Sequence, residues 1–177
     1  RHIVIITEYV PQRHMFIIYR RWRQARQHPD STGNLNGDSL HATHHQVAAR
    51  SAGLAQRTRD AGLQPGDRVM VFARNHPRYL EVMWGLWWAG LVAVPVNAKL
   101  HPREVEWIAA NCGARWAFVT ADVAPEPLGG IERQIDLESP QAAALLAPAP
   151  DPFAVPVTQR DLGDTAWRFY TSGTTGR

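Results

Sequence analysis

Between residues 68 and 119 the sequence alternates short apolar runs with amphipathic segments, and this alternation limits the folds that the chain can adopt. The runs 68–73, 91–94 and 116–119 have the length of strands. An apolar run without polar alternation is typical of a strand that is covered on both faces. Strands that alternate with helices over short connections form parallel sheets. The sequence therefore predicts the α/β class, with a parallel sheet and flanking helices.

Helical spacing of apolar side chains occurs on both sides of these runs. The spacing predicts helices in segments 40–62, 77–90 and 102–113, each of which ends at a glycine, the residue that most often terminates a helix. The second and third helices are predicted to begin at a proline, which is favoured in the first turn. Farther along, we expect one more short strand within 131–137 and a short helix at 141–146, set in connecting structure rich in Pro and Ala.

The N-terminal quarter shows weaker patterns. Apolar residues at 3–6 and 16–19 are compatible with short strands, but clusters of Gly, Pro, Asn and Asp that favour turns follow them. We therefore predict an irregular segment over residues 1–36. Residues 37–177 are predicted to form one partial domain.

The charge pattern gives little support for nucleic-acid binding. The chain has 19 Lys and Arg against 16 Asp and Glu, a formal net charge of +3. Its basic residues are scattered, apart from a short cluster made of Arg20, Arg21, Arg23 and Arg26. A nucleic-acid groove requires basic residues gathered on one face, so we expect no nucleic-acid partner and interpret these arginines as a solvated face.

The sequence also predicts a cytoplasmic protein without an integral membrane segment. Residues 82–96 carry no charge, but as a helix they would span roughly 22 Å, which is short of a bilayer core of about 30 Å. The first eight residues lack the long apolar region of a secretory signal. Cys112 is the single cysteine and cannot form an internal disulfide.

Several other side chains invite a functional interpretation that we weigh less than a structural one. His41, His44 and His45 lack a third metal ligand, and we interpret them as surface histidines near a helix start. Cys112 has no base beside it and is interpreted as a core thiol. The tryptophans at helical spacing are interpreted as core residues: Trp84, Trp87 and Trp88. No Gly-x-Gly-x-x-Gly follows the first strand, which disfavours an NAD-dependent oxidoreductase.

The last seven residues carry the strongest chemical signal, because Ser, Thr and Gly follow one another directly after the apolar and aromatic run 165–170. Glycines let consecutive N–H groups point into one concavity, and the hydroxyl groups add further donors. This combination suits a polyphosphate. It differs from the Walker arrangement, which requires Lys after the second Gly. On composition alone, a flexible Ser/Thr/Gly tail is about as well supported as a phosphate-binding loop.

The segment Tyr170–Arg177 resembles the phosphate-loop signature of the adenylate-forming (AMP-binding) superfamily, which includes acyl-CoA synthetases, adenylation domains and luciferases. In that family the signature continues Pro-Lys-Gly. Further family landmarks match in the right order at 63–69, 75–77, 88–90 and 94–97. The resemblance covers about residues 37–177 and is closest to fatty-acyl or aryl-acid CoA ligases. It implies the N-terminal part of an adenylate-forming large domain.

The resemblance further implies a ligase that uses ATP, Mg²⁺ and CoA to activate a small-molecule carboxylic acid through an acyl-adenylate. The positions that match the family's phosphate contacts are Thr171, Ser172, Gly173, Thr174, Thr175 and Gly176. The 177 residues include neither the family's Mg²⁺-binding Glu nor its catalytic Lys, so no catalytic or metal-binding residue is assigned and the fragment is predicted to be inactive alone. The alternative is a non-catalytic α/β module that binds a partner rather than ATP.

Overall fold

The computed structural model describes residues 2–6, 23–36, 39–161 and 163–173. Its centre is a four-stranded parallel sheet with the strand order β5-β4-β6-β7. The strands are β4 (Arg68–Phe72), β5 (Val92–Val96), β6 (Trp116–Val119) and β7 (Arg133–Asp136). The predicted α/β class and the predicted parallel sheet are therefore confirmed, and the strand expected within 131–137 is the outer strand β7.

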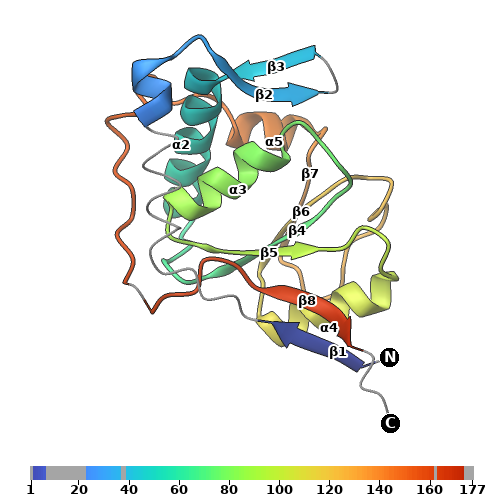
Figure 1. The fold of residues 1–177 in the computed structure, drawn as a ribbon. Coiled ribbons are helices and arrows are strands. Elements are labelled where there is room, and N and C mark those ends of the chain that lie inside the picture. Colours follow the sequence, from blue (N-terminus) through green and yellow to red (C-terminus); the bar gives the residue numbers. More distant parts are fainter. Residues whose placement is uncertain (1, 7–22, 37–38, 162, 174–177) are drawn as a thin grey trace.

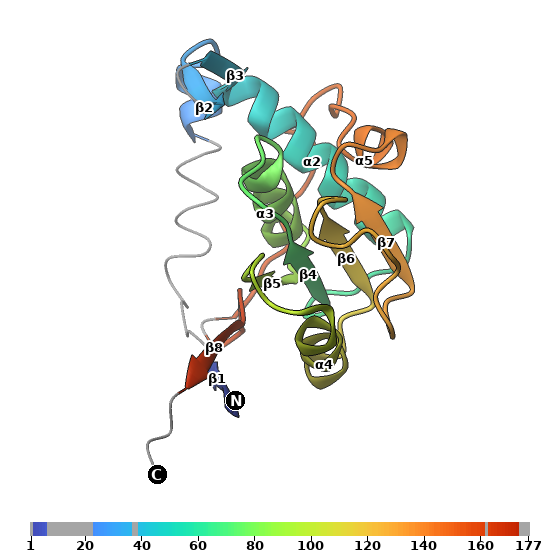
Figure 2. The ribbon, with the colours of Figure 1, turned by 90° about the vertical axis from the view of Figure 1, so that its right-hand side faces the viewer.

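Helices cover both faces of this sheet. They are α2 (His44–Asp60), α3 (Tyr79–Trp88), α4 (Pro102–Cys112) and α5 (Pro140–Leu145). Figure 2 shows α2, α3 and α5 on one side of the sheet and α4 on the other. The consecutive connections β4-α3-β5 and β5-α4-β6 thus lie on opposite faces, so the chain leaves the carboxyl ends of β4 and β5 in opposite directions.

Strand β4 shows why its sequence lacks polar alternation. Val69 and Val71 pack into the core that α2 and α3 share with the sheet, whereas Met70 and Phe72 pack into the core under α4. All four side chains are 0% exposed. Because successive side chains of a strand point to opposite faces, a strand between two helical layers must be apolar at every position.

Helix α2 begins later than the sequence predicts. Leu40 lies in strand β3 (Ser39–Thr43), and the helix starts at His44. Thr43 and Gln46 form a capping box, in which each side chain bonds the backbone N–H of the other residue. This reciprocal cap satisfies N–H groups that otherwise have no partner in the first turn, and it sets the helix start. The helical spacing of apolar residues, with Leu40, Val47 and Leu54 seven residues apart, extends into the strand and gives no sign of this boundary.

The N-terminal quarter contains more regular structure than the sequence predicts. Strand β1 (His2–Ile6), a short helix over 23–27 and strand β2 (Thr32–Asn36) lie within the segment expected to be irregular. β2 pairs antiparallel with β3, so this hairpin spans the predicted boundary between residues 36 and 37. β1 agrees with the strand expected at 3–6, and the strand expected at 16–19 falls outside the described residues. The division at residue 37 stays a prediction.

The charge-free segment 82–96 is folded as two elements rather than one. Its first part belongs to α3, which is followed by a turn at Gly90 (φ 75°), and its second part contains β5. Within the described ranges, no helix has both the length and the apolar character needed to span a membrane. Leu80, which the helical spacing places on the apolar face of α3, is instead 43% exposed.

Candidate functional site

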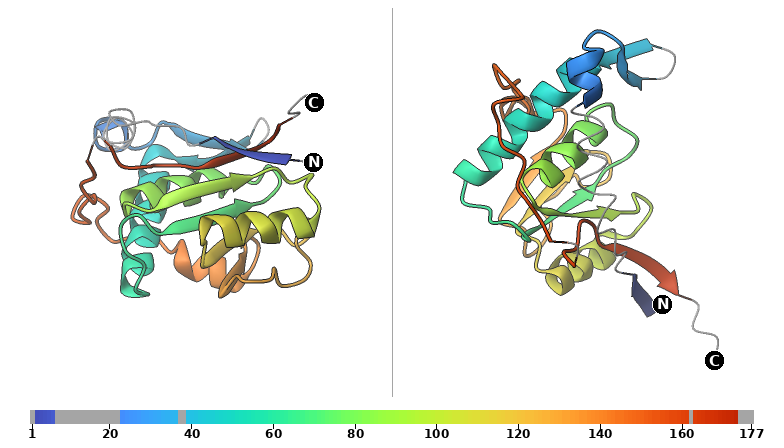
Figure 3. Two further views of the ribbon diagram at one scale, coloured as in Figure 1. Left: turned by 90° about the horizontal axis from the view of Figure 1, so that it is seen from below. Right: turned by 60° about the vertical axis from the view of Figure 1, so that its left-hand side comes forward.

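Three of the six predicted phosphate contacts lie in a strand rather than in a turn. Strand β8 (Phe169–Gly173) includes Thr171, Ser172 and Gly173, whereas Thr174, Thr175 and Gly176 fall outside the described residues. β8 pairs antiparallel with β1, so that Thr171 lies opposite Val4. Figure 3 shows the two strands side by side. The sequence predicts that the turn starts at Thr171. Pairing with β1, a partner more than 160 residues away in the sequence, extends the strand by these three positions.

The chain that leads into β8 runs along the free edge of the parallel sheet. The backbone N–H of Ala93 in β5 donates to the carbonyl oxygen of Ala166 at 3.0 Å, and the N–H of Arg168 donates to the carbonyl oxygen of Ala93 at 2.9 Å. This bridge is parallel. The chain therefore advances past β5 toward the carboxyl ends of the sheet strands before it reaches Thr171 (Figure 1). In open α/β sheets, ligands bind outside the carboxyl ends of the strands.

This leading segment is less buried than its apolar composition predicts. Of residues 165–171 only Ala166 is buried, Thr171 is exposed and the others are half-buried. The reason is its position at the edge, where the sheet covers it on one side only. Trp87 and Trp88, predicted to be core residues, are 8% and 2% exposed in the core shared with α2, and Trp84 is partly buried against the same core.

Tyr170 attaches β8 to helix α4. It packs against the core under α4, whereas Trp167 packs against the core shared with α2 and α3. The Tyr170 hydroxyl donates to Oδ1 of Asn111 at 2.8 Å, and its ring meets Trp107 edge to face with 6.2 Å between the ring centroids. Burial is the main cause that raises the pKa of Tyr170 above its ordinary value. The residue immediately before the predicted phosphate contacts is therefore held by α4.

The carboxyl edge of the sheet also gathers polar side chains that the sequence did not single out. After β4, the N–H of Arg74 donates to Oγ1 of Thr120, which follows β6, at 3.2 Å. Nε2 of His76 lies 2.6 Å from Oε1 of Glu138, which follows β7. A hydrogen bond from His76 is the main cause that lowers the pKa of Glu138, and the charge of His76 adds to it. These side chains could have been found from the sequence, because each follows a predicted strand and the carboxyl ends of parallel strands meet at the same end of a sheet.

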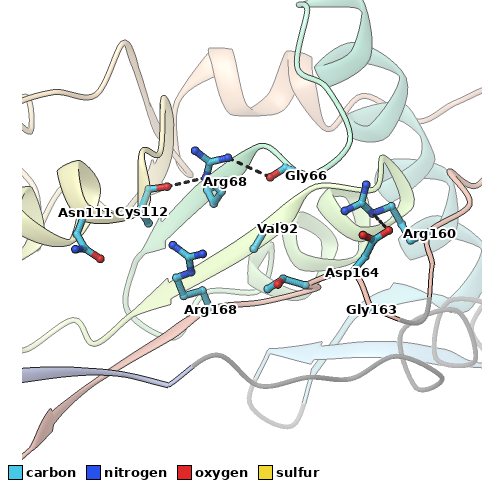
Figure 4. A pocket seen from close by; sticks show the side chains of 10 residues that line it. Gly66, Arg68, Val92, Asn111, Cys112, Arg160, Gly163, Asp164 and Arg168 are labelled. Atoms are coloured by element: carbon cyan, nitrogen blue, oxygen red, sulfur yellow. Dashed lines mark hydrogen bonds and ion pairs between the residues drawn. The ribbon is translucent and has the colours of Figure 1, made fainter.

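A pocket of about 440 Å³ opens at the opposite end of the strands, near the amino ends of β4 and β5 (Figure 4). Among its lining residues, Arg68 donates from Nε to the carbonyl oxygen of Cys112 at 2.6 Å, and Arg160 pairs with Asp164 at 3.1 Å. Arg68 thus neutralises the carbonyl end of α4. Because strand direction separates the two ends, this pocket is distinct from the place where β8 leads.

The other side chains considered as ligands or nucleophiles have structural partners. His41 is half-buried rather than on the surface, with Nε2 3.4 Å from Oε1 of Glu81. His44 and His45 are also half-buried. In the part of the chain that the structure describes, no three His, Cys, Asp or Glu side chains gather as a metal site would need. Cys112 is a buried thiol, as predicted, and burial is the main cause that raises its pKa.

Comparison with known sequences identifies relatives of this fold. The family model described as "AMP-binding enzyme" matches residues 22–177. A feruloyl-CoA synthase of an Amycolatopsis species is 36% identical over 155 residues, which cover 88% of this chain and 30% of that protein. The long-chain-fatty-acid–CoA ligase FadD13 of Mycobacterium tuberculosis is 30% identical over 141 residues, 72% of this chain and 27% of that protein. The chain spans about 30% of the length of these curated relatives.

Solved structures agree with this relationship. An inhibitor-bound crystal structure of the N-terminal domain of FACL13 from Mycobacterium tuberculosis superposes with a TM-score of 0.76 at 26% identity, over 90% of this chain and 42% of that one. The parallel sheet with its flanking helices is thus the fold of an N-terminal domain of adenylate-forming enzymes, and the family match covers most of the chain. The chain belongs to the AMP-binding enzyme family, the adenylate-forming superfamily that its sequence resembles.

Proposed function

We propose that these residues are the N-terminal part of an ATP-dependent ligase that joins a carboxylic acid to CoA through an acyl-adenylate. Family membership supports the reaction class, since the relatives include a feruloyl-CoA synthase and a long-chain-fatty-acid–CoA ligase. The observation that carries the site is the parallel bridge between Ala93 and Trp167, which directs Thr171 toward the carboxyl ends of the strands. A cytoplasmic location, with no nucleic-acid partner, completes the proposal.

In the first step the acid carboxylate attacks the α-phosphorus of ATP, and the bond from that phosphorus to pyrophosphate breaks. Negative charge then grows on the departing pyrophosphate. We assign Thr171, Ser172, Gly173, Thr174, Thr175 and Gly176 to its β- and γ-phosphates, where N–H and hydroxyl donors stabilise the developing charge. In the second step the thiol of CoA attacks the acyl carbonyl and AMP leaves.

The 177 residues are proposed not to complete this reaction alone. They span about 30% of the relatives' length, and we assign them phosphate contacts but no catalytic side chain. Mg²⁺, when bound with ATP, neutralises phosphate charge. The residues with described positions include no cluster that would hold the ion, so we assign no Mg²⁺ ligand to them.

The test is acid-dependent exchange of labelled pyrophosphate into ATP by the complete protein that carries these residues, with carboxylic acids of different length. Exchange with at least one acid is expected. Thr174→Ala and Thr175→Ala are expected to lower the rate by about tenfold or more, because each removes a donor to the leaving group. Thr32→Ala, an exposed threonine in the β2–β3 hairpin, is the matched control.

Two results would contradict the proposal. Absence of exchange with every acid, together with no ATP-dependent rise in melting temperature, would favour the non-catalytic module that binds a partner. Equal rates for the Thr32, Thr174 and Thr175 variants would remove these residues from the phosphate site.

A further inference from the structure

Trp87 makes a buried contact with the segment that leads into the predicted phosphate loop. Its indole Nε1–H donates to the carbonyl oxygen of Ala166 at 2.9 Å, and the Trp87 side chain is only 8% exposed. Ala166 itself is 3% exposed. The bond therefore joins helix α3 to the chain shortly before Thr171, in a place that water does not reach.

Backbone hydrogen bonds join this described segment to the central sheet at a single position. Its parallel pairing with β5 is an isolated bridge at Ala93, made by two hydrogen bonds, whereas the ladder of β8 is formed with β1. One of those two bonds ends on the carbonyl of Ala166, the group that Trp87 also contacts. A single bridge specifies the direction of a strand weakly, so the bond from Trp87, the second at the Ala166 carbonyl, adds a constraint.

Aromatic contacts continue from Trp87 along the segment. The ring centroids of Trp87 and Trp167 are 5.2 Å apart with an interplanar angle of 75°, and those of Trp167 and Phe169 are 5.1 Å apart. The first pair is edge to face and the second is tilted, and aromatic pairs at this distance add to the stabilisation that burial provides. The row ends at Phe169, the first residue of β8. Trp87 thus contacts both the backbone and a side chain of the segment.

We propose that Trp87 is a positioning residue for the triphosphate of ATP. By holding Ala166 and Trp167, it sets where β8 begins and hence the position of Thr171, the first of the assigned phosphate contacts. A donor displaced from its phosphate oxygen makes a weaker hydrogen bond, so ATP should bind less tightly. This inference rests on the proposed function, and it adds a residue of α3 that makes no phosphate contact of its own.

The test compares two neighbouring tryptophans in the complete protein. Trp87→Phe keeps an aromatic ring and removes the N–H donor. Trp88→Phe is the matched control, because Nε1 of Trp88 also donates to a backbone carbonyl, that of Val155 at 3.1 Å, away from β8. We expect Trp87→Phe to raise the KM for ATP about three- to tenfold, the range of one buried hydrogen bond, with the KM for the acid unchanged. Trp88→Phe is expected to change neither KM.

Hydrogen exchange provides a second readout that does not depend on activity. Trp87→Phe is expected to speed the exchange of the Arg168 amide, which donates to Ala93, while Trp88→Phe leaves it unchanged. Benzothienylalanine at position 87 replaces the N–H with sulfur at nearly constant shape. It is expected to give the same increase in KM for ATP if Trp87→Phe does not fold.

The outcomes separate the inference from the proposed function. If the wild-type protein exchanges pyrophosphate but the Trp87 variants keep its KM for ATP, or raise both KM values equally, the positioning role is wrong and the ligase proposal stands. If the wild-type protein shows no exchange at all, the proposed function fails first and the positioning role fails with it.

Discussion

Arg50 and Glu81 form an ion pair between α2 and α3, with 2.7 Å between Nη1 of Arg50 and Oε1 of Glu81. The Glu81 side chain is completely buried, and His41 of β3 approaches the same oxygen. A carboxylate in such a place is costly unless charge and hydrogen bonds compensate for the lost water. One carboxylate therefore connects the β2–β3 hairpin and two helices.

Removal of the cation from this pair is expected to destabilise the protein strongly. Arg50→Met leaves Glu81 buried without its main partner, so we expect a loss of about 3 kcal/mol in the free energy of unfolding, measured by urea denaturation. Arg74→Met is the control, because Arg74 pairs with Asp122 at the surface and such pairs contribute about 0–1 kcal/mol. Similar losses in the two variants would contradict this view of Glu81.

The close approach of α2 and α3 depends on Gly85. A Cβ atom at this position would lie 2.7 Å from Cδ2 and 2.9 Å from Cβ of Leu54. Alanine favours a helix over glycine by about 1 kcal/mol, but overpacking costs about 1–3 kcal/mol, and rotation of the leucine cannot move its Cβ away. Gly85→Ala is therefore expected to lower the melting temperature. A double-mutant cycle with Leu54→Ala checks the cause, since Gly85→Ala should cost less once Leu54 is truncated.

Cys112 is expected to resist alkylation in the folded protein. Its pKa is raised mainly by burial, and the nearby Arg68 and Arg168 only partly oppose this effect. Because the folded pKa lies above the unfolded one, the associated stability is complete below the ordinary thiol pKa and is lost as the pH rises through the higher folded value. Iodoacetamide at pH 8 should modify residue 112 at least about tenfold more slowly in the native protein than in urea, as measured by peptide mass spectrometry. Equal rates would contradict a buried thiol.

The His76–Glu138 pair is expected to appear in an acid titration. Since the pKa of Glu138 is lowered in the folded protein, the pair stabilises above the ordinary carboxyl pKa, and this contribution is lost as the pH falls through the lowered value. Glu138 is 76% exposed, so solvent screens the effect on stability, and NMR titration of the carboxylate is the better measurement. His76→Ala should raise the pKa of Glu138 toward its usual value. The pKa of Glu132, which Arg115 lowers, should not change.

The sequence predicted the central elements well because each of them is signalled locally. The strands β4 and β6 are continuous apolar runs, and α4 has Pro102 at its start and Gly113 at its end. The family signature at 170–177 is likewise a local pattern. The start of α2 was predicted less well, since the helical spacing of apolar residues already begins at Leu40 and only the capping box at Thr43 marks the boundary.

The candidate site could be predicted only in part. Its hydroxyl and glycine residues are visible in the sequence, but the pairing of β8 with β1 joins residues from the two ends of the chain, and no local pattern carries that information. The contact between Trp87 and Ala166 could not be predicted either, because helical spacing predicts that a tryptophan is buried but not which group its N–H contacts. Likewise, the apolar residues around Glu81 do not reveal that Arg50, 31 residues away, is its partner.

By itself, the sequence determined the α/β class, the order of the central strands and helices along the chain, and the adenylate-forming family, because periodicity, helix ends and short motifs act within a few residues. The tertiary structure alone decided the strand order β5-β4-β6-β7, the burial of Glu81 beside Arg50 and the route by which β8 reaches the carboxyl edge of the sheet. These features depend on hydrogen bonds and packing between residues that are far apart in the chain, and such contacts exist only once the chain has folded.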